Sequence, residues 1–303
     1  MMKISKPIVF FGSGLVAAES LEFISRNFNV EAVITKPKKS NSRDPVPVID
    51  VSNALGIKIY TPTGKDELDS LLDENNFSSE VAILIDYGII VSQKVINSFK
   101  LGIINSHFSL LPAWRGPDPI SFSILNGDKT TGVSLMLLSI GVDEGKLIAQ
   151  EKIDIKNSSS VELTESLIKL SNSMLTKYMP DYLSGDLVPY TQSDRMLPSF
   201  SRKLTKQDGV IDWSKPAIKI EREIRAFISW PKSFTKIYGI PVIITAAVVG
   251  DSTGEPSSIT YDKKSMKINC REGSLNILRL KPVGKNDMEI SSFIAGYANQ
   301  FDY

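Results

Sequence analysis

Asn105 and His107 stand two residues apart at the end of an apolar run that begins at Gly102. In a β-strand, side chains two apart face the same way, so we expect the carboxamide and the imidazole side by side near the carboxyl end of the strand. Ligands bind at that end of open α/β sheets. A carboxamide donor beside an imidazole suits a reaction in which an oxyanion develops while a proton moves.

Asp143 lies in a short loop between Gly141 and Gly145. A carboxylate in such a loop can orient an imidazole and stabilise its charged form. Each feature also has an ordinary structural explanation, because Asn-x-His at a strand end is often a hydrogen-bonded pair and a Gly-flanked aspartate is often only a turn. Taken one at a time, these residues leave a structural and a catalytic interpretation open.

The sequence contains one histidine, His107, and one cysteine, Cys270. The lone cysteine cannot form an internal disulfide, and a zinc site built from histidine and cysteine ligands is excluded. Counting leaves an all-oxygen site of carboxylates open, but we expect no metal. Because histidine is the side chain whose ordinary pKa lies near neutrality, His107 is the natural candidate for a general base.

Residues 1–186 alternate strand and helix patterns, which indicates an open, mostly parallel, Rossmann-like α/β sheet. Apolar residues at helical spacing predict a helix over 17–28 and a long amphipathic helix over 161–182. Several predicted strands are apolar throughout, as expected for strands covered on both faces. The predicted strands are 6–12, 30–34, 58–60, 81–85, 102–107 and 132–138.

The pattern changes after the long helix. Residues 187–206 have no clear periodicity, and we interpret them as a linker. A short helix is predicted over 217–227, and short alternating runs separated by glycine turns occupy 233–280. Residues 207–303 are therefore expected to form a second, smaller, antiparallel β domain of the barrel type.

Charge is distributed unevenly along the chain. The net charge is +1, but residues 199–303 carry 16 Lys+Arg against 11 Asp+Glu, whereas residues 1–198 carry 19 against 23. The positive last third suits contact with phosphates, although ordinary scatter of surface charge gives similar counts. The first residues lack the apolar region of a secretory signal, and no run reaches the roughly 18 residues of a membrane span. We therefore expect a cytoplasmic protein.

An ordered set of motifs between residues 105 and 145 resembles the core of the 10-formyltetrahydrofolate-dependent formyltransferases. The shared motifs are Asn105-Ser-His107, Ser109-Leu-Leu-Pro112, Arg115-Gly116 with Pro119, Gly127-Asp128, Thr131-Gly-Val133 and Asp143-Glu-Gly145. Further segments are similar to the family members that formylate methionyl-tRNA, and they extend the resemblance over nearly the whole chain. These segments are Tyr87-Gly88, Ile211-Asp-Trp213, Ile224-Arg-Ala-Phe227 with Trp230-Pro231, and residues 280–285.

The resemblance implies that the cosubstrate is 10-formyltetrahydrofolate and that the acceptor is the α-amine of initiator methionyl-tRNA, a step of translation initiation. It implies a catalytic triad of Asn105, His107 and Asp143, and an OB-like C-terminal barrel that helps hold the tRNA. The implied folate site comprises Ser109, Leu110, Leu111, Pro112, Asp86, Tyr87, Gly88, Ile89, Ile90 and Val142. The expected tRNA contacts are Lys36, Lys38, Lys39, Arg43, Arg202 and Lys203. A monomer is expected.

Several positions depart from the family pattern. Ser13-Gly-Leu15 replaces a Thr-Pro-acidic sequence, and Asp86 and Asp118 stand where small apolar residues are usual. Residues 36–47 form a shorter loop than the basic loop with which the family reaches the tRNA acceptor stem. Other functions stay open: formyl transfer to an amino sugar nucleotide or another small amine, or hydrolysis of 10-formyltetrahydrofolate. The non-enzymatic alternative is a catalytically silent RNA-binding protein on the same fold.

Overall fold

The computed structural model describes residues 4–38, 46–193 and 196–301. The chain divides into two compact units. Unit 1 takes its described residues from 1–116, 130–154 and 164–200, and unit 2 from 117–129, 155–163 and 201–303. Of the segment interpreted as a linker, residues 187–200 thus belong to unit 1 and residues 201–206 to unit 2.

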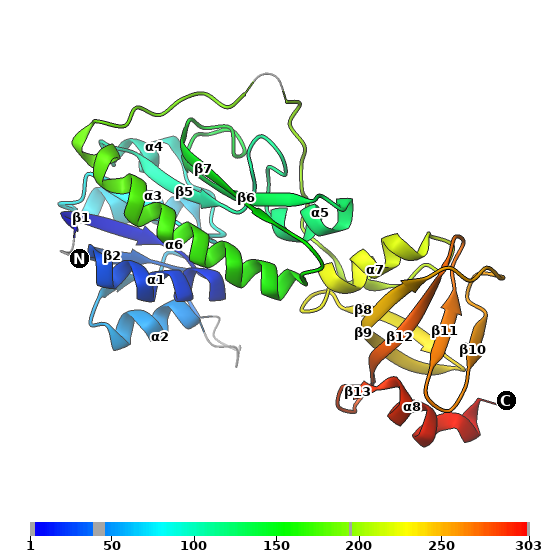
Figure 1. Ribbon diagram of the computed structural model, residues 1–303. Helices are drawn as coiled ribbons and strands as arrows, with labels where there is room; N and C mark the ends of the chain where they lie inside the picture. The colour runs from blue at the N-terminus through cyan, green and yellow to red at the C-terminus, as the bar shows by residue number, and fades with distance from the viewer. Residues whose placement is uncertain (1–3, 39–45, 194–195, 302–303) are drawn as a thin grey trace. The chain divides into compact units, whose positions relative to one another are not determined.

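Unit 1 is built on a seven-stranded sheet with the strand order β3-β2-β1-β4-β5-β6-β7 (Figure 1). Strands β1 to β5 pair in parallel, and β6 and β7 add antiparallel pairs at one edge. The predicted mostly parallel α/β sheet is therefore confirmed. The strands are β1 (Ile4–Phe11), β2 (Phe28–Ile34), β3 (Lys58–Tyr60), β4 (Val81–Leu84), β5 (Ile103–His107), β6 (Thr130–Leu137) and β7 (Leu147–Asp154).

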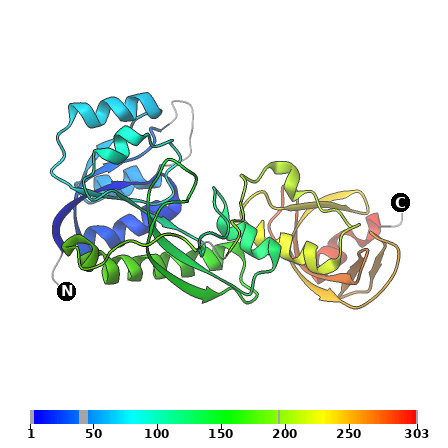
Figure 2. The ribbon, with the colours of Figure 1, turned by 90° about the horizontal axis from the view of Figure 1, so that it is seen from above.

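Helices cover both faces of this sheet. Seen from above, α1 and α6 lie on one side of the sheet and α3 on the other (Figure 2). The predicted long helix is confirmed, since α6 spans Ser160–Ser184. The other helices between the strands are α1 (Leu15–Asn27), α2 (Pro47–Ala54), α3 (Lys65–Glu74), α4 (Gln93–Asn97) and α5 (Pro119–Asn126), of which α5 belongs to unit 2.

The alternation of side chains along β5 decides which face carries the candidate residues. Ile103 packs in a buried cluster with Leu68 of α3 and Val95 of α4. Asn105 and His107 follow at intervals of two and share that face. Ser106 points to the opposite face, where its hydroxyl hydrogen-bonds the Ser171 hydroxyl of α6 at 2.7 Å. The two candidate side chains therefore stand together at the carboxyl end of β5, as predicted.

Unit 2 contains an antiparallel sheet of the order β10-β11-β12-β9-β8, with β13 paired to β12. Helices α7 and α8 pack their apolar sides against it, so that Ile220 and Phe293 are fully buried. The sheet forms a half-barrel, which confirms the predicted antiparallel β domain. Its elements are η1 (Lys206–Gly209), α7 (Ala217–Ala226), β8 (Ser233–Ile237), β9 (Ile240–Gly250), β10 (Ile259–Tyr261), β11 (Met266–Asn269), β12 (Ser274–Pro282), β13 (Met288–Glu289), α8 (Ile290–Tyr297) and η2 (Ala298–Gln300).

Candidate active site

Asn105 and His107 occupy the middle of the sheet, where β5 lies between the parallel β4 and the antiparallel β6. Asn105 pairs with Leu84 on one side and with Met136 on the other, and His107 pairs with Ser134. Their neighbours on both sides leave Asn105 8% and His107 6% exposed. The strand ladder therefore fixes the backbone from which both functional groups project.

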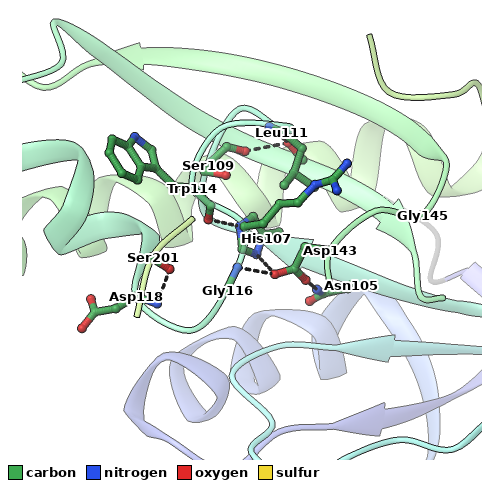
Figure 3. A network of polar contacts seen from close by, with 12 residues as sticks. Asn105, His107, Ser109, Leu111, Trp114, Gly116, Asp118, Asp143, Gly145 and Ser201 are labelled. Atoms are coloured by element: carbon green, nitrogen blue, oxygen red, sulfur yellow. Dashed lines mark hydrogen bonds and ion pairs between the residues drawn. The ribbon is translucent and has the colours of Figure 1, made fainter. Parts of the chain in front are cut away.

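Asp143 reaches both residues from the loop after β6 (Figure 3). Its Oδ1 accepts a long hydrogen bond of 3.4 Å from the Asn105 amide, and its Oδ2 lies 3.6 Å from His107 Nδ1. The same Oδ2 accepts a hydrogen bond of 2.7 Å from the Gly116 amide. The structure thus brings together the three residues that were predicted as a triad.

The second ring nitrogen of His107 faces the carbonyl oxygen of Trp114 at 3.1 Å. A carbonyl oxygen only accepts, so Nε2 carries the hydrogen and donates it. The proton that the ring gains or loses therefore sits on Nδ1, facing the Asp143 carboxylate. Burial lowers the pKa of His107 below its ordinary range, and the charge of Asp143 opposes this shift. Burial thus favours the neutral ring, while the Asp143 carboxylate is in place to stabilise the protonated form.

The predicted folate segment, Ser109 to Pro112, is fixed by two polar side chains from the neighbouring strands. Ser134 of β6 accepts a hydrogen bond of 3.0 Å from the Leu111 amide and donates one of 2.6 Å to the Ser109 carbonyl. Gln150 of β7 donates to the Leu111 carbonyl at 2.9 Å and to the Ser134 hydroxyl at 2.8 Å. This loop is therefore rigidly attached to the sheet beside His107.

Replacement of Ser134 by alanine tests this attachment. The change leaves the buried Leu111 amide and the Ser109 carbonyl without their partner, so we expect the free energy of unfolding to fall by about 1–3 kcal/mol. Urea denaturation measures the loss. Ser52→Ala is the matched control, because that buried hydroxyl donates only to the Val48 carbonyl within helix α2. Equal losses in the two variants would contradict a special role for Ser134.

The other predicted folate residues follow β4 and the start of the Asp143 loop. Tyr87 packs edge-to-face on Phe11 with ring centroids 5.4 Å apart, and its buried hydroxyl has no hydrogen-bond partner among the described residues. Ile90 and Val142 are 76% and 61% exposed. These residues thus provide two exposed aliphatic side chains and one buried hydroxyl without a partner among the described residues.

Asp86 is one of the positions that depart from the family pattern. It adopts a left-handed conformation with φ of 47°, and its carboxylate lies so close over Gly14 that a β-carbon there would come within 1.8 Å of Oδ2. The side chain keeps contact with solvent, yet the protein atoms around it raise the pKa of the carboxyl, and the Lys36 ammonium opposes that shift. The glycine after β1 therefore provides the space that this aspartate occupies.

The predicted tRNA contacts lie in both units. Lys36 and Lys38 are exposed after β2, and the Lys36 amide donates to the Ser13 hydroxyl at 3.3 Å. In unit 2, Lys203 is exposed, while Arg202 makes hydrogen bonds with the Asp208 carboxylate, one of them at 2.9 Å. Lys39 and Arg43 lie outside the described residues.

One cavity of unit 1 lies beside the Asp143 loop. It measures about 560 Å³ and is lined by residues of the 137–146 segment together with Arg115, Thr191 and Gln192. A second cavity, of about 430 Å³, lies in unit 2 beside η1 and α7 and is lined by Lys215, Lys219 and Glu223 among others. Gln192 was not predicted to belong to the site, because the segment that carries it shows no periodicity or motif.

The described part of the chain contains neither a metal-binding cluster nor a helix that could span a membrane. Within it, no group of three or more histidine, cysteine, aspartate or glutamate side chains is arranged to hold a metal ion. Among its helices, none combines the length and the apolar character needed to cross a membrane.

Comparison with known proteins places the chain in a family. The formyl transferase family matches residues 6–178, and the C-terminal domain of formyl transferases matches residues 203–298. The chain therefore belongs to the formyl transferase family. Among its relatives is the methionyl-tRNA formyltransferase of Myxococcus xanthus, which is 32% identical over 301 residues, covering 97% of this chain and 96% of the relative. The methionyl-tRNA formyltransferase of Listeria innocua is 31% identical over 297 residues, covering 95% of both chains.

A solved structure supports the fold. The crystal structure of WlaRD, a sugar 3N-formyltransferase with dTDP and 5-N-formyl-THF, matches with a TM-score of 0.70 at 21% identity. The match covers 93% of this chain and 99% of that one. The fold is thus that of formyltransferases in both units.

Proposed function

We propose that this protein transfers the formyl group of 10-formyltetrahydrofolate to the α-amine of initiator methionyl-tRNA. The observation that carries the proposal is the convergence of the Asp143 carboxylate on Asn105 and His107 at the carboxyl end of β5. Similarity to methionyl-tRNA formyltransferases along 97% of the chain supports the choice of acceptor.

The reaction needs one new bond and one broken bond. The neutral α-amine attacks the formyl carbon, and the resulting tetrahedral intermediate carries a negative oxygen. Asn105 donates a hydrogen bond to that oxygen, and protonated His107 stabilises its charge. The bond from the formyl carbon to N10 of the folate then breaks, while one proton leaves the amine and one reaches N10. His107 and Asp143 carry this proton, directly or through a water molecule.

The folate is proposed to bind beside the Ser109–Pro112 loop, with its pterin between residues 86–90 and Val142. The unpartnered Tyr87 hydroxyl and the exposed Ile90 and Val142 side chains support this placement. WlaRD, which was crystallised with a formylated tetrahydrofolate, has the same fold. The reaction as written needs no metal.

The second unit is proposed to hold the tRNA. We propose a catalytic domain over residues 1–186, a linker over 187–206 and an OB-like tRNA-binding domain over 207–303, in a cytoplasmic monomer. The excess of 16 Lys+Arg over 11 Asp+Glu in residues 199–303 supports contact with phosphates. Lys36 and Lys38 after β2, together with Lys39 and Arg43, are the proposed contacts of the catalytic domain.

An acceptor competition tests the proposed function. Labelled 10-formyltetrahydrofolate is offered to the protein with charged initiator methionyl-tRNA, charged elongator methionyl-tRNA and an amino sugar nucleotide, and release of labelled formate is followed in parallel. We expect label on the initiator tRNA. Label on the sugar, or formate alone, would replace the proposal by a sugar formyltransferase or a hydrolase. Folate binding without turnover would support a catalytically silent RNA-binding protein.

A salt series tests the phosphate contacts separately. We expect the Michaelis constant for methionyl-tRNA to rise as KCl is raised, because each phosphate contact releases a condensed counterion. Lys36→Ala and Lys38→Ala should each reduce the slope of the log–log plot by about one. Lys100→Ala is the matched control, since that lysine precedes β5 at the opposite end of the sheet and pairs with Glu80. A slope that neither variant changes would remove both lysines from the interface.

A further inference from the structure

The segment that starts at Tyr190 contacts two loops of the site: the loop after β5, which carries Trp114 and Arg115, and the Asp143 loop. Its described residues, 190–193 and 196–200, contain no helix or regular strand. At its start, Tyr190 and Leu147 exchange backbone hydrogen bonds of 2.7 and 2.9 Å. At its end, the Arg115 amide donates to the Ser199 carbonyl at 2.9 Å, and the Trp114 amide donates to the Ser199 hydroxyl at 2.9 Å. The segment is thus attached to unit 1 on both sides of Gln192.

Gln192 joins the two loops through its carboxamide. Its Nε2 donates to the Asp143 carbonyl at 2.8 Å and to the Gly145 carbonyl at 3.0 Å. Its Oε1 accepts a hydrogen bond of 2.8 Å from the Arg115 guanidinium. Because the guanidinium is charged, it polarises the carboxamide and strengthens the donation to the two carbonyls.

The Asp143 loop needs such a restraint. Asp143 adopts a left-handed conformation with φ of 48°, which costs a residue with a β-carbon on the order of 1 kcal/mol or more. The carboxylate must nevertheless stay 2.7 Å from the Gly116 amide and 3.6 Å from His107 Nδ1. Fixing the carbonyls of Asp143 and Gly145 fixes the backbone from which this carboxylate projects.

We propose that Gln192 is a positioning residue, which clamps the Asp143 loop so that the carboxylate remains against His107. The inference rests on the proposed function, and it adds a residue from outside the motif core to the machinery. Gln192 acts through Asp143 and touches no reacting atom. Its loss should therefore matter only while residue 143 carries a carboxylate.

The uniqueness of His107 makes a direct test available. In the untagged protein every imidazole NMR signal belongs to His107, because the chain has no other histidine. Asp143 supplies the carboxylate that faces the ring. Arg115 and Glu144 are the charged neighbours on the two loops, and Arg115 Nη1 lies 3.9 Å from Glu144 Oε2. Gln192→Met keeps the side-chain length, removes the donor and leaves every charge in place.

The experiment compares Gln192→Met, Asp143→Asn and the double variant with the wild type. Gln192→Met should lower kcat by roughly 10- to 100-fold, because small misplacements of a reacting group cost that much, with the Michaelis constants nearly unchanged. Gln192→Met should also lower the pKa of His107, because it lets the Asp143 carboxylate move away from the ring. Asp143→Asn should lower the same pKa, because it removes that carboxylate. In the Asp143→Asn background, Gln192→Met should change neither kcat nor the pKa of His107. Gln93→Met is the matched control, as that exposed glutamine bonds only Asn97 in helix α4.

The results distinguish a failure of the inference about Gln192 from a failure of the proposed function. A loss of kcat with an unchanged pKa of His107, or an equal loss in the Asp143→Asn background, would show that Gln192 only stabilises the fold and would overturn the inference. A wild-type rate in Gln192→Met would overturn it as well. If the wild-type protein formylates no methionyl-tRNA, the proposed function fails, but the NMR titration still decides whether Gln192 holds Asp143 against His107.

Discussion

Replacement of His107 by alanine should lower kcat for formyl transfer by at least about 10²- to 10³-fold. The imidazole gains and loses its second proton at Nδ1, which faces Asp143, and no other side chain in the sequence titrates ordinarily near neutrality. Without it, the proton must leave the amine to water, and the intermediate loses a cationic neighbour. Rapid-quench measurement with saturating methionyl-tRNA gives the rate of the chemical step.

The stability of the His107→Ala variant provides the control. Burial lowers the pKa of His107 in the folded state, so the unfolded chain binds more protons between that lowered value and the ordinary value of about 6.5. The wild-type protein therefore loses stability as the pH falls below about 6.5, and the variant should lack this contribution. A variant that folds well at pH 7.5 and still turns over near the wild-type rate would remove His107 from the mechanism.

Replacement of Asn105 by alanine should lower kcat by on the order of 10²- to 10³-fold, with little change in either Michaelis constant. Among the described residues, the side-chain amide of Asn105 makes only a long hydrogen bond of 3.4 Å to Asp143, so its donor capacity is available to an oxygen that becomes negative during the reaction. Because that charge exists only in the tetrahedral intermediate and in the transition states on either side of it, the substitution should lower kcat. Steady-state kinetics in both substrates measure it.

Asn97→Ala is the matched control for this variant. That asparagine is exposed at the end of α4 and accepts a hydrogen bond from Gln93. Its replacement should leave kcat unchanged. If Asn105→Ala lost less than about tenfold in kcat, or lost only substrate affinity, the carboxamide would be a structural partner of Asp143 and not an oxyanion donor.

The sequence predicted the sheet well, because the parallel strands are continuous apolar runs. The Asn-x-His spacing placed Asn105 and His107 on one face, and the strand ladder of β5 shows them there. Strand β7 was missed, since its second half, from Gln150 to Asp154, is polar except for Ile153 and lies at the edge of the sheet. Helix α3 was also missed, because it has only three apolar residues, Leu68, Leu71 and Leu72, and of these only Leu68 is fully buried.

The contacts that complete the site were less accessible to prediction. Asp143 was placed beside His107 by a family motif, but its left-handed conformation and its bond to the Gly116 amide depend on tertiary packing. Ser134 lies inside a predicted strand, where a single polar residue has no specific meaning, and Gln150 lies in the strand that was missed. Gln192 lies in a segment without periodicity, so only the folded chain brings it within 2.8 Å of the Asp143 carbonyl.

A single-turnover experiment tests the central claim most directly. Enzyme in excess is mixed with methionyl-tRNA and 10-formyltetrahydrofolate labelled in the formyl carbon, and the products are separated after mild hydrolysis of the aminoacyl ester. We predict that the label is recovered as N-formylmethionine in the wild type and that its formation slows by at least about 10²-fold in both Asn105→Ala and His107→Ala. Recovery of the label as formate, or equal rates in all three proteins, would contradict the account.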